Sequence, residues 1–218
     1  MIYHKKISFF SLLIIFFHFS SIVSANQSTH KIEILVNDKI ITNYDIAQHF
    51  AINSILDNIN VTPENGDFLY NKTVNELIDM KIQQAKINEY NIKIEDENKE
   101  YYENYYFQSK RLDKNKVYEI IKSNNLDVDA LKEKINTSIA WEQLTAGLFF
   151  HTISISDSEI SELLKNDESL SPELAKRILT NKQVQLKSDK YLRDLRAEAN
   201  IEKRYFNCKK ISWSKFYY

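Results

Sequence analysis

The chain has 218 residues, with 29 basic and 30 acidic side chains and a formal net charge of −1. This balance excludes the basic footprint of a nucleic-acid-binding protein. It contains only two glycines and two prolines, and both glycines, Gly66 and Gly147, stand alone. The sequence therefore favours long helices and lacks the Gly-rich loops that hold nucleotide phosphates.

The first 25 residues have the pattern of a secretory signal peptide. Lys5 and Lys6 form a basic head, residues 7–19 are an almost unbroken apolar run, and small residues predict cleavage between Ala25 and Asn26. The apolar run is shorter than the roughly 20 residues of a membrane span. We therefore expect export to the periplasm, and an uncleaved anchor in the inner membrane, facing the periplasm, remains the alternative.

The chain after this segment is expected to open with a β-hairpin. Residues 31–36 predict a strand, Asn37 with the following aspartate predicts a tight turn, and residues 39–42 predict the return strand. Thr42 and Asp45 have the spacing of a capping box, so a helix is expected to start there.

The middle of the chain is predicted to be helical. Thr62-Pro63-Glu64 is expected to separate two helices, and Pro63 is suited to a first helical position. The strongest helix follows and is expected to end at Asn91, because Asn tolerates the left-handed conformation. That helix carries an apolar stripe at three-and-four spacing, made of Val74, Leu77, Ile78, Ile82 and Ala85. Further helices are expected over residues 95–111, 116–122 and 127–148.

The C-terminal part predicts a second capping box, a linker, a long helix and a closing strand. The capping box pairs Ser156 with Glu159, and Ser171 starts the long helix. The closing strand has one obvious partner, the edge of the N-terminal hairpin. The expected ranges are 152–155 for a short β-like segment, 166–171 for the linker, 172–197 for the helix and 199–202 for the strand.

These segments, in this order, resemble the SurA-type periplasmic chaperones. The likeness is carried by the hairpin at 34–42, the helix at 75–85 with its exit at 90–94, residues 150–164, and the helix and strand at 191–202. Asn91 stands where that family usually has glycine. The resemblance implies a mainly α, multi-helix chaperone region over residues 26–165. It also implies that residues 172–204 pack back on the same domain and close the small β-hairpin.

The chain departs from that family at one joint. SurA-type proteins carry parvulin prolyl isomerase domains between the two segments, but here only seven residues separate Leu164 from Pro172. The histidines after the signal segment, which are His30, His49 and His151, are scattered, as is Cys208. We therefore expect no catalytic site, no metal site and no cofactor.

The resemblance implies an ATP-independent holdase. Its expected partners are unfolded outer-membrane proteins or other extended polypeptides, with no nucleic acid and no nucleotide, and self-association stays open. Two alternatives remain, a peptidyl-prolyl isomerase by family analogy and a membrane-anchored interaction module.

The densest aromatic cluster is the candidate client-binding surface. It consists of Tyr101, Tyr102, Tyr105, Tyr106 and Phe107. At this spacing the tyrosines cover one broad helical face, which serves either as a core seam or as the wall of a client groove. A second apolar stretch, residues 141–150, is expected to pack in the core, and the basic, aromatic tail at 205–218 gives no clear structural prediction.

Overall fold

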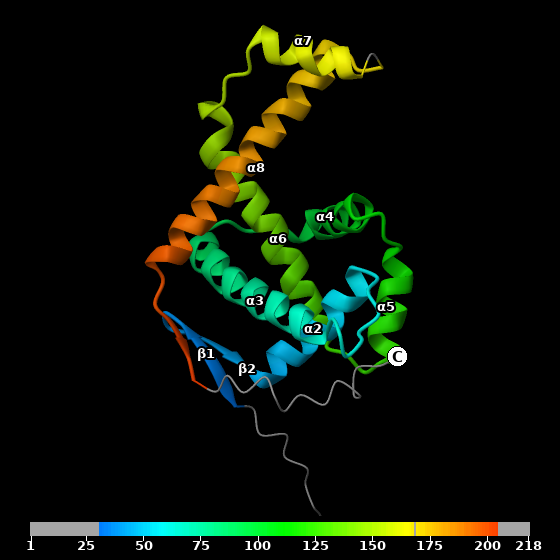
Figure 1. Ribbon diagram of the computed structural model, residues 1–218, viewed down its shortest axis with the longest axis vertical. Coiled ribbons are helices and arrows are strands. Elements are labelled where there is room, and N and C mark those ends of the chain that lie inside the picture. The colour runs from blue at the N-terminus through cyan, green and yellow to red at the C-terminus, as the bar shows by residue number, and fades with distance from the viewer. Residues whose placement is uncertain (1–30, 168, 205–218) are drawn as a thin grey trace, which may run out of the picture.

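The computed structural model describes residues 31–167 and 169–204. The predicted signal peptide, its cleavage at Ala25 and Asn26, Cys208 and the tail 205–218 lie outside the described residues. The described chain is mainly helical with a small antiparallel sheet at one end (Figure 1), so the mainly α prediction is confirmed. The elements are β1 (Ile32–Val36), β2 (Lys39–Thr42), α2 (Asn43–Leu56), α3 (Gly66–Glu89), α4 (Asp96–Ser109), α5 (Lys114–Ser123), α6 (Val128–Phe149), the 3₁₀ turn η2 (Phe150–Thr152), α7 (Asp157–Asn166), α8 (Pro172–Glu198) and β3 (Ile201–Lys203).

The sheet joins the two ends of the described chain. Its strand order is β2-β1-β3, with both pairings antiparallel. Leu35 in the central strand lies opposite Ile40 on one side and Glu202 on the other. The Asn37 amide donates to the Asn200 carbonyl at 2.8 Å and extends the β1–β3 contact. The predicted closure of the hairpin by the C-terminal strand is therefore confirmed.

Asparagine takes the place of glycine at the sharp ends of several elements. A positive φ is costly for most residues, and asparagine tolerates it better than others because its short side chain bonds locally. Asn91 has a φ of 53° directly after α3, as predicted. The residues other than glycine with positive φ are Asn37, Asn58, Asn91, Arg111 and Asn125.

Side-chain caps fix the starts of five described helices, α2, α5, α6, α7 and α8, and three of these caps bear directly on the sequence analysis. Thr42 and Asp45 form a reciprocal capping box before α2, and Ser156 and Glu159 form another before α7. The Ser171 hydroxyl accepts a hydrogen bond from the Leu174 amide at 3.2 Å at the start of α8. These caps satisfy amides that have no partner inside the helix, and all three were predicted.

Two local predictions were wrong. Pro63 is not the first residue of α3, because residues 62–65 form a separate turn in which the Gly66 amide donates to the Thr62 carbonyl at 2.9 Å. The Asn65 side chain also accepts from the Thr62 amide at 2.8 Å and stabilises that turn. The β-like segment 152–155 forms no strand, since it leaves η2 as an extended connection without a neighbouring strand to pair with.

The apolar interior consists of three clusters. The first lies between the sheet, α2 and α3 and includes the fully buried Ile34 and Ile78. The second joins α2, α4, α5 and α6 around Phe107 and Leu131. The third lies where α3 and α6 meet α8 and contains Trp141. We call the part that holds these clusters, residues 31–149 and 185–204, the body.

Residues 150–184 extend away from the body as an arm. The arm comprises η2, α7 and the first half of α8, and it lies at the opposite end of the molecule from the sheet (Figure 1). Helix α7 packs against α8. Among the described residues of the arm only Ala175 is buried, so the arm has no core of its own.

Candidate functional site

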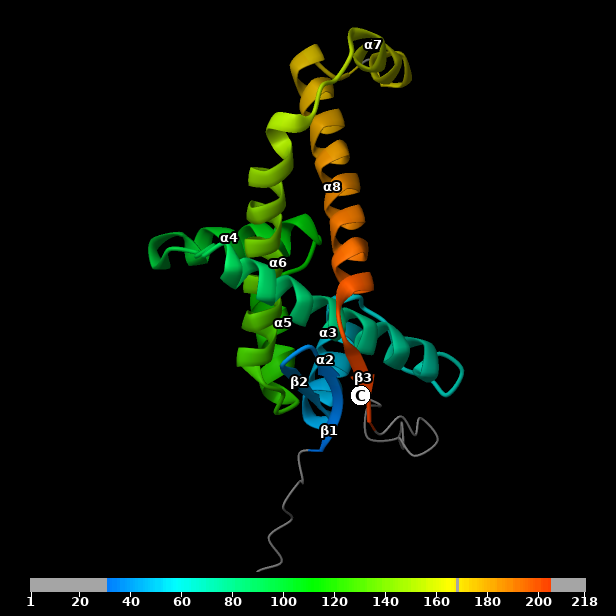
Figure 2. The same ribbon diagram turned by 90° about the vertical axis from the view of Figure 1, so that its left-hand side faces the viewer.

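A cleft lies where α4 and α8 approach each other over α6, with α4 and α8 on opposite sides of α6 in Figure 2. Its inner cavity, of about 400 Å³, is lined by α2, α3, α4, α6 and α8. Its outer cavity, of about 380 Å³, is lined by α3, α4, α6 and α8. The two cavities adjoin each other, and the residues that line both are Gln83, Tyr106, Lys110, Ser138, Trp141 and Leu192.

Helix α4 supplies an aromatic wall to this cleft. Tyr105 lines the outer cavity, is 45% exposed, and its hydroxyl donates to a Glu142 carboxylate oxygen at 3.4 Å. Tyr106 lines both cavities, and the Lys110 ammonium lies 5.3 Å from the centre of its ring. Burial raises the pKa of the Tyr106 phenol, so this hydroxyl stays protonated. The wall therefore offers apolar ring faces together with hydroxyl groups.

Trp141 holds α8 against α6 and closes one side of the cleft. Its indole N–H donates to the Ser188 hydroxyl at 3.0 Å, and both side chains are buried. The indole also stacks on Tyr191, with 5.7 Å between the ring centres. A buried indole N–H needs a partner, so Ser188 fixes the position of α8 relative to the cleft.

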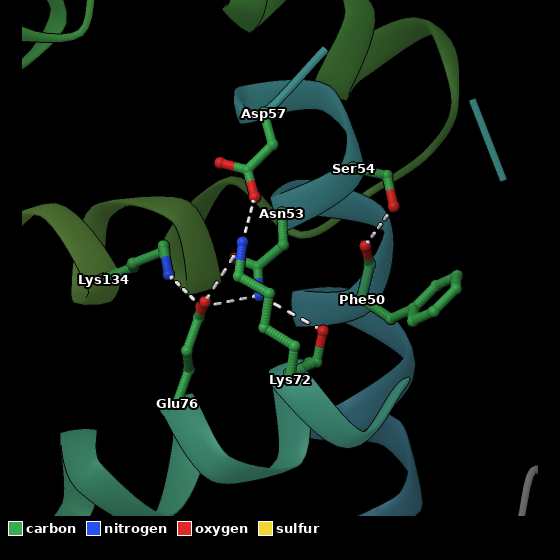
Figure 3. A network of polar contacts seen from close by, with 8 residues as sticks. Phe50, Asn53, Ser54, Asp57, Lys72, Glu76 and Lys134 are labelled. Carbon is green, nitrogen blue, oxygen red and sulfur yellow. Dashed lines mark hydrogen bonds and ion pairs between the residues drawn. The ribbon is translucent and has the colours of Figure 1, made fainter. Parts of the chain in front are cut away.

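A chain of ion pairs crosses the inner cavity from α2 to α6, as Figure 3 shows. The Lys72 ammonium lies 2.6 Å from Asp57 and 3.8 Å from Glu76. The other carboxylate oxygen of Glu76 is 3.0 Å from the Lys134 ammonium. The hydrogen bond to Asp57 raises the pKa of Lys72, so the ammonium stays charged at neutral pH.

His49 is a buried, uncharged group on the same cavity wall. It comes from α2, is only 4% exposed and makes no hydrogen bond to another described residue. Burial, followed by the positive charge of Lys134, lowers its pKa from 6.5 to about 4. The imidazole is therefore neutral near pH 7 and offers the cavity one donor and one acceptor.

Asn53 lies one helical turn after His49 and lines the same cavity. Its amide nitrogen donates to Glu76 at 2.9 Å and to the Thr73 hydroxyl at 3.2 Å (Figure 3 shows the contact with Glu76). Its carbonyl oxygen, Oδ1, is buried and has no hydrogen-bond partner among the described residues. A buried acceptor without a partner is unusual in a folded protein.

The predicted aromatic cluster divides between core and surface. Tyr105 lines the cleft, whereas Tyr106 and Phe107 are 6% and 1% exposed and both belong to the second core cluster, against which Tyr102 also packs. Tyr106 also lines both cavities from within that cluster. Tyr101 is 67% exposed, and its ring contacts that of Tyr102 at 5.3 Å. One face of α4 therefore packs in the core, and the adjacent side of the helix faces the cleft and the solvent.

The second apolar stretch is also divided. Trp141 and Leu144 are buried, as expected. Phe150 is 53% exposed, so the expectation of core packing is wrong at that residue. It follows the end of α6, where the chain leaves the body for the arm.

The sequence analysis did not single out His49, Asn53, Glu76 or Lys134. One signal was present, because His49 and Asn53 are four residues apart on a helix whose other inward positions are apolar. Two polar side chains on a buried helical face indicate a site or a hydrogen-bonded network. Glu76 and Lys134 come together only through the packing of α3 and α6, which the sequence does not display.

Comparison with known proteins adds no relative. No protein-family model matches the chain, and no curated protein matches it. Within residues 31–167 and 169–204, no helix is long and apolar enough to cross a membrane. The same residues contain no cluster of three or more His, Cys, Asp and Glu side chains that would suit a metal ion.

Proposed function

We propose that this protein is an exported, ATP-independent holdase that resembles the chaperone region of SurA-type proteins. In this role it binds unfolded outer-membrane proteins in the periplasm and keeps them from aggregating. The observation that supports the proposal is the cleft with its aromatic wall. Its two adjoining cavities, of about 400 and 380 Å³, are each in the size range of ligand pockets.

The chemistry of the cleft suits an extended polypeptide. Tyr105 supplies a ring face for apolar side chains, and the polar groups of the inner cavity supply partners for backbone amides. Strands of outer-membrane barrels alternate apolar and polar residues, so an unfolded barrel protein presents both kinds of group. Binding of this kind needs no bond chemistry, and we expect no turnover of proline-containing tetrapeptides.

The proposal is tested by the aggregation of a urea-unfolded outer-membrane β-barrel protein after dilution, followed by light scattering. We expect stoichiometric amounts of the purified protein to slow aggregation without ATP. The variant Tyr105→Ser should lose most of this effect, because it removes the exposed part of the aromatic wall. An undiminished aggregation rate with the wild-type protein would refute the holdase function.

Tyr90 provides a matched control for the aromatic wall. It is 46% exposed, nearly the same as Tyr105, but it lines neither cavity of the cleft. The variant Tyr90→Ser should therefore protect the client as well as the wild type does. Equal losses in the Tyr90→Ser and Tyr105→Ser variants would mean that exposed tyrosine, and not the cleft, carries the activity.

Export is tested separately. We propose that the signal segment is cleaved, so the protein recovered from the periplasm should begin at Asn26. Recovery in the membrane pellet after carbonate extraction, with residues 1–25 retained, would favour the anchored alternative.

A further inference from the structure

The carboxylates that line the inner cavity are already paired within the chain. Asp57 and Glu76 contact Lys72, Glu76 also contacts Lys134, and Asp79 lies 2.5 Å from Arg196. Lys110, which also lines the cavity, lies over the Tyr106 ring. A cationic ligand group entering this cavity would lose its water without gaining a free carboxylate. The cavity therefore favours an uncharged group over a cation.

One atom of the cavity wall still lacks a partner. The Asn53 amide cannot be turned around, because its oxygen would then face the Glu76 carboxylate, which is also an acceptor. Oδ1 is thus held as a buried acceptor without a donor among the described residues. The ligand group that complements it is an N–H donor.

We infer that the inner cavity is a subsite for an uncharged amide of the bound polypeptide, whose N–H donates to Oδ1 of Asn53. This inference rests on the proposed holdase function and adds the kind of group that the cleft selects. A glutamine or asparagine side chain and a backbone peptide bond both present the required N–H.

A cationic donor fits this subsite poorly. Lysine and arginine also carry N–H groups, but the ammonium groups of Lys72 and Lys134 both contact Glu76, the residue to which Asn53 donates. The lowered pKa of His49, caused by burial and then by Lys134, supports the same conclusion, because these surroundings disfavour a positive charge on a neighbouring side chain.

Oδ1 has almost no accessible surface, so a ligand N–H reaches it only when neighbouring side chains move. One such neighbour is Lys72, whose ammonium bridges Asp57 and Glu76, the residue to which Asn53 donates. The Lys72 side chain is 40% exposed, and ion pairs at this exposure contribute little stability, so displacing it costs little.

The test uses the wild-type protein and fluorescein-labelled peptides in which serine and valine alternate around one central glutamine. Three matched peptides carry, at the centre, a dimethylated glutamine amide, a backbone N-methyl group, or lysine. Removing the N–H that reaches Asn53 should weaken binding about 5- to 50-fold in fluorescence anisotropy. Weaker binding of the dimethylated peptide would show that the glutamine side chain supplies this N–H, and weaker binding of the N-methylated peptide would show that the backbone supplies it. The lysine peptide should bind more weakly than the glutamine peptide.

Asn53→Leu should abolish the penalty for methylation, because Oδ1 is gone. The matched control Asn136→Leu changes an exposed helical asparagine that does not line the cleft, and it should keep the penalty. Thermal melts establish whether each variant is folded. If Asn53→Leu does not fold, the binding of the matched peptides to the wild-type protein still tests whether an N–H is required.

Two results would overturn the inference while leaving the holdase proposal intact. One is equal binding of the glutamine, dimethylated and N-methylated peptides, as expected if water alone satisfies Oδ1. The other is a methylation penalty that persists in folded Asn53→Leu. If no peptide binds at all, and unfolded barrel protein is also left unprotected, the proposed function fails together with the subsite.

Discussion

The body and the arm are built from the same kinds of helix but differ in what holds them. The body contains all three buried clusters, including fully buried side chains such as Ile78 and Ile121. The described part of the arm buries only Ala175. Helix α7 packs on α8 but has no buried residue, and it begins at a reciprocal capping box. Its start is therefore defined by a local hydrogen-bond pattern and not by a core. The comparison shows that helical structure and tertiary stability come from different parts of the sequence.

Truncating one isoleucine in each region should give the largest contrast. Ile78 in the body is 0% exposed, and Ile178 in the arm is 41% exposed. Ile78→Ala should lower the free energy of unfolding by about 4 kcal/mol, because it leaves a cavity in the core. Ile178→Ala should lower it by less than about 1 kcal/mol. Urea unfolding followed by circular dichroism measures both, and similar losses would show that the arm is as tightly packed as the body.

Acid should destabilise the body through His49. Its pKa is about 4 in the folded state, against 6.5 in the unfolded chain, so the unfolded chain binds more protons between these pH values. The contribution of neutral His49 to the free energy of unfolding is therefore fully present above about pH 6.5. It is lost as the pH drops, and the free energy of unfolding is lower by about 3 kcal/mol near pH 4.

Urea unfolding at a series of pH values measures this effect. The charged groups that act on the pKa of His49 are Lys134, Glu133, Lys81 and Asp45. The two lysines lower this pKa and the two carboxylates raise it, whereas burial is the largest cause of the shift. Added salt should therefore change the dependence of the unfolding free energy on pH only modestly. His49→Gln should flatten the profile between pH 6.5 and 4, whereas His151→Gln, at an exposed site in the arm, should leave it unchanged. An unaltered slope in His49→Gln would assign the acid sensitivity to the carboxylates.

The packing of α8 on α6 within the body is expected to depend on one buried hydrogen bond. Ser188→Ala leaves the Trp141 indole N–H without its partner, which should lower the free energy of unfolding by about 1–2 kcal/mol. Trp141→Phe combined with Ser188→Ala completes a double-mutant cycle and isolates the pair. Ser161→Ala is the control, because this exposed serine in α7 bonds only within its own helix. A coupling energy near zero would mean that water replaces the bond.

The two capping boxes give the finest comparison. Thr42→Ala removes the cap of α2 in the body and should lower global stability by about 1 kcal/mol. Ser156→Ala removes the cap of α7 in the arm, where the helix can open without unfolding the body. It should change global stability by less than about 0.3 kcal/mol but speed hydrogen exchange of the α7 amides. A full loss in global stability for Ser156→Ala would show that the arm and the body unfold together.

The features that the sequence predicted well are those decided within a few neighbouring residues. The hairpin turn at Asn37, the exit of α3 at Asn91 and the cap at Ser156 each follow from the conformation or the hydrogen bond of one side chain. Pro63 was assigned to α3 wrongly because the Asn65 side chain stabilises a separate turn, and that bond depends on the folded loop.

The cleft could be predicted only in part. The aromatic helix was recognised, but its division into buried Phe107 and cleft-lining Tyr105 depends on how α4 packs against α6 and α8. The inner cavity was missed because its members come from distant parts of the chain. Glu76 and Lys134, for example, meet across 58 positions in sequence.

The position of β1 at the centre of the sheet has a consequence for how the protein forms. Its first neighbour, β2, follows after a two-residue turn, but its second neighbour comes from residues 201–203, close to the end of the described chain. A chain made from its N-terminus exposes one edge of β1 until residues 201–203 have been made, because they form the strand that covers it. This closure has a high contact order, and until it forms the nascent protein has the kind of open strand edge that promotes aggregation.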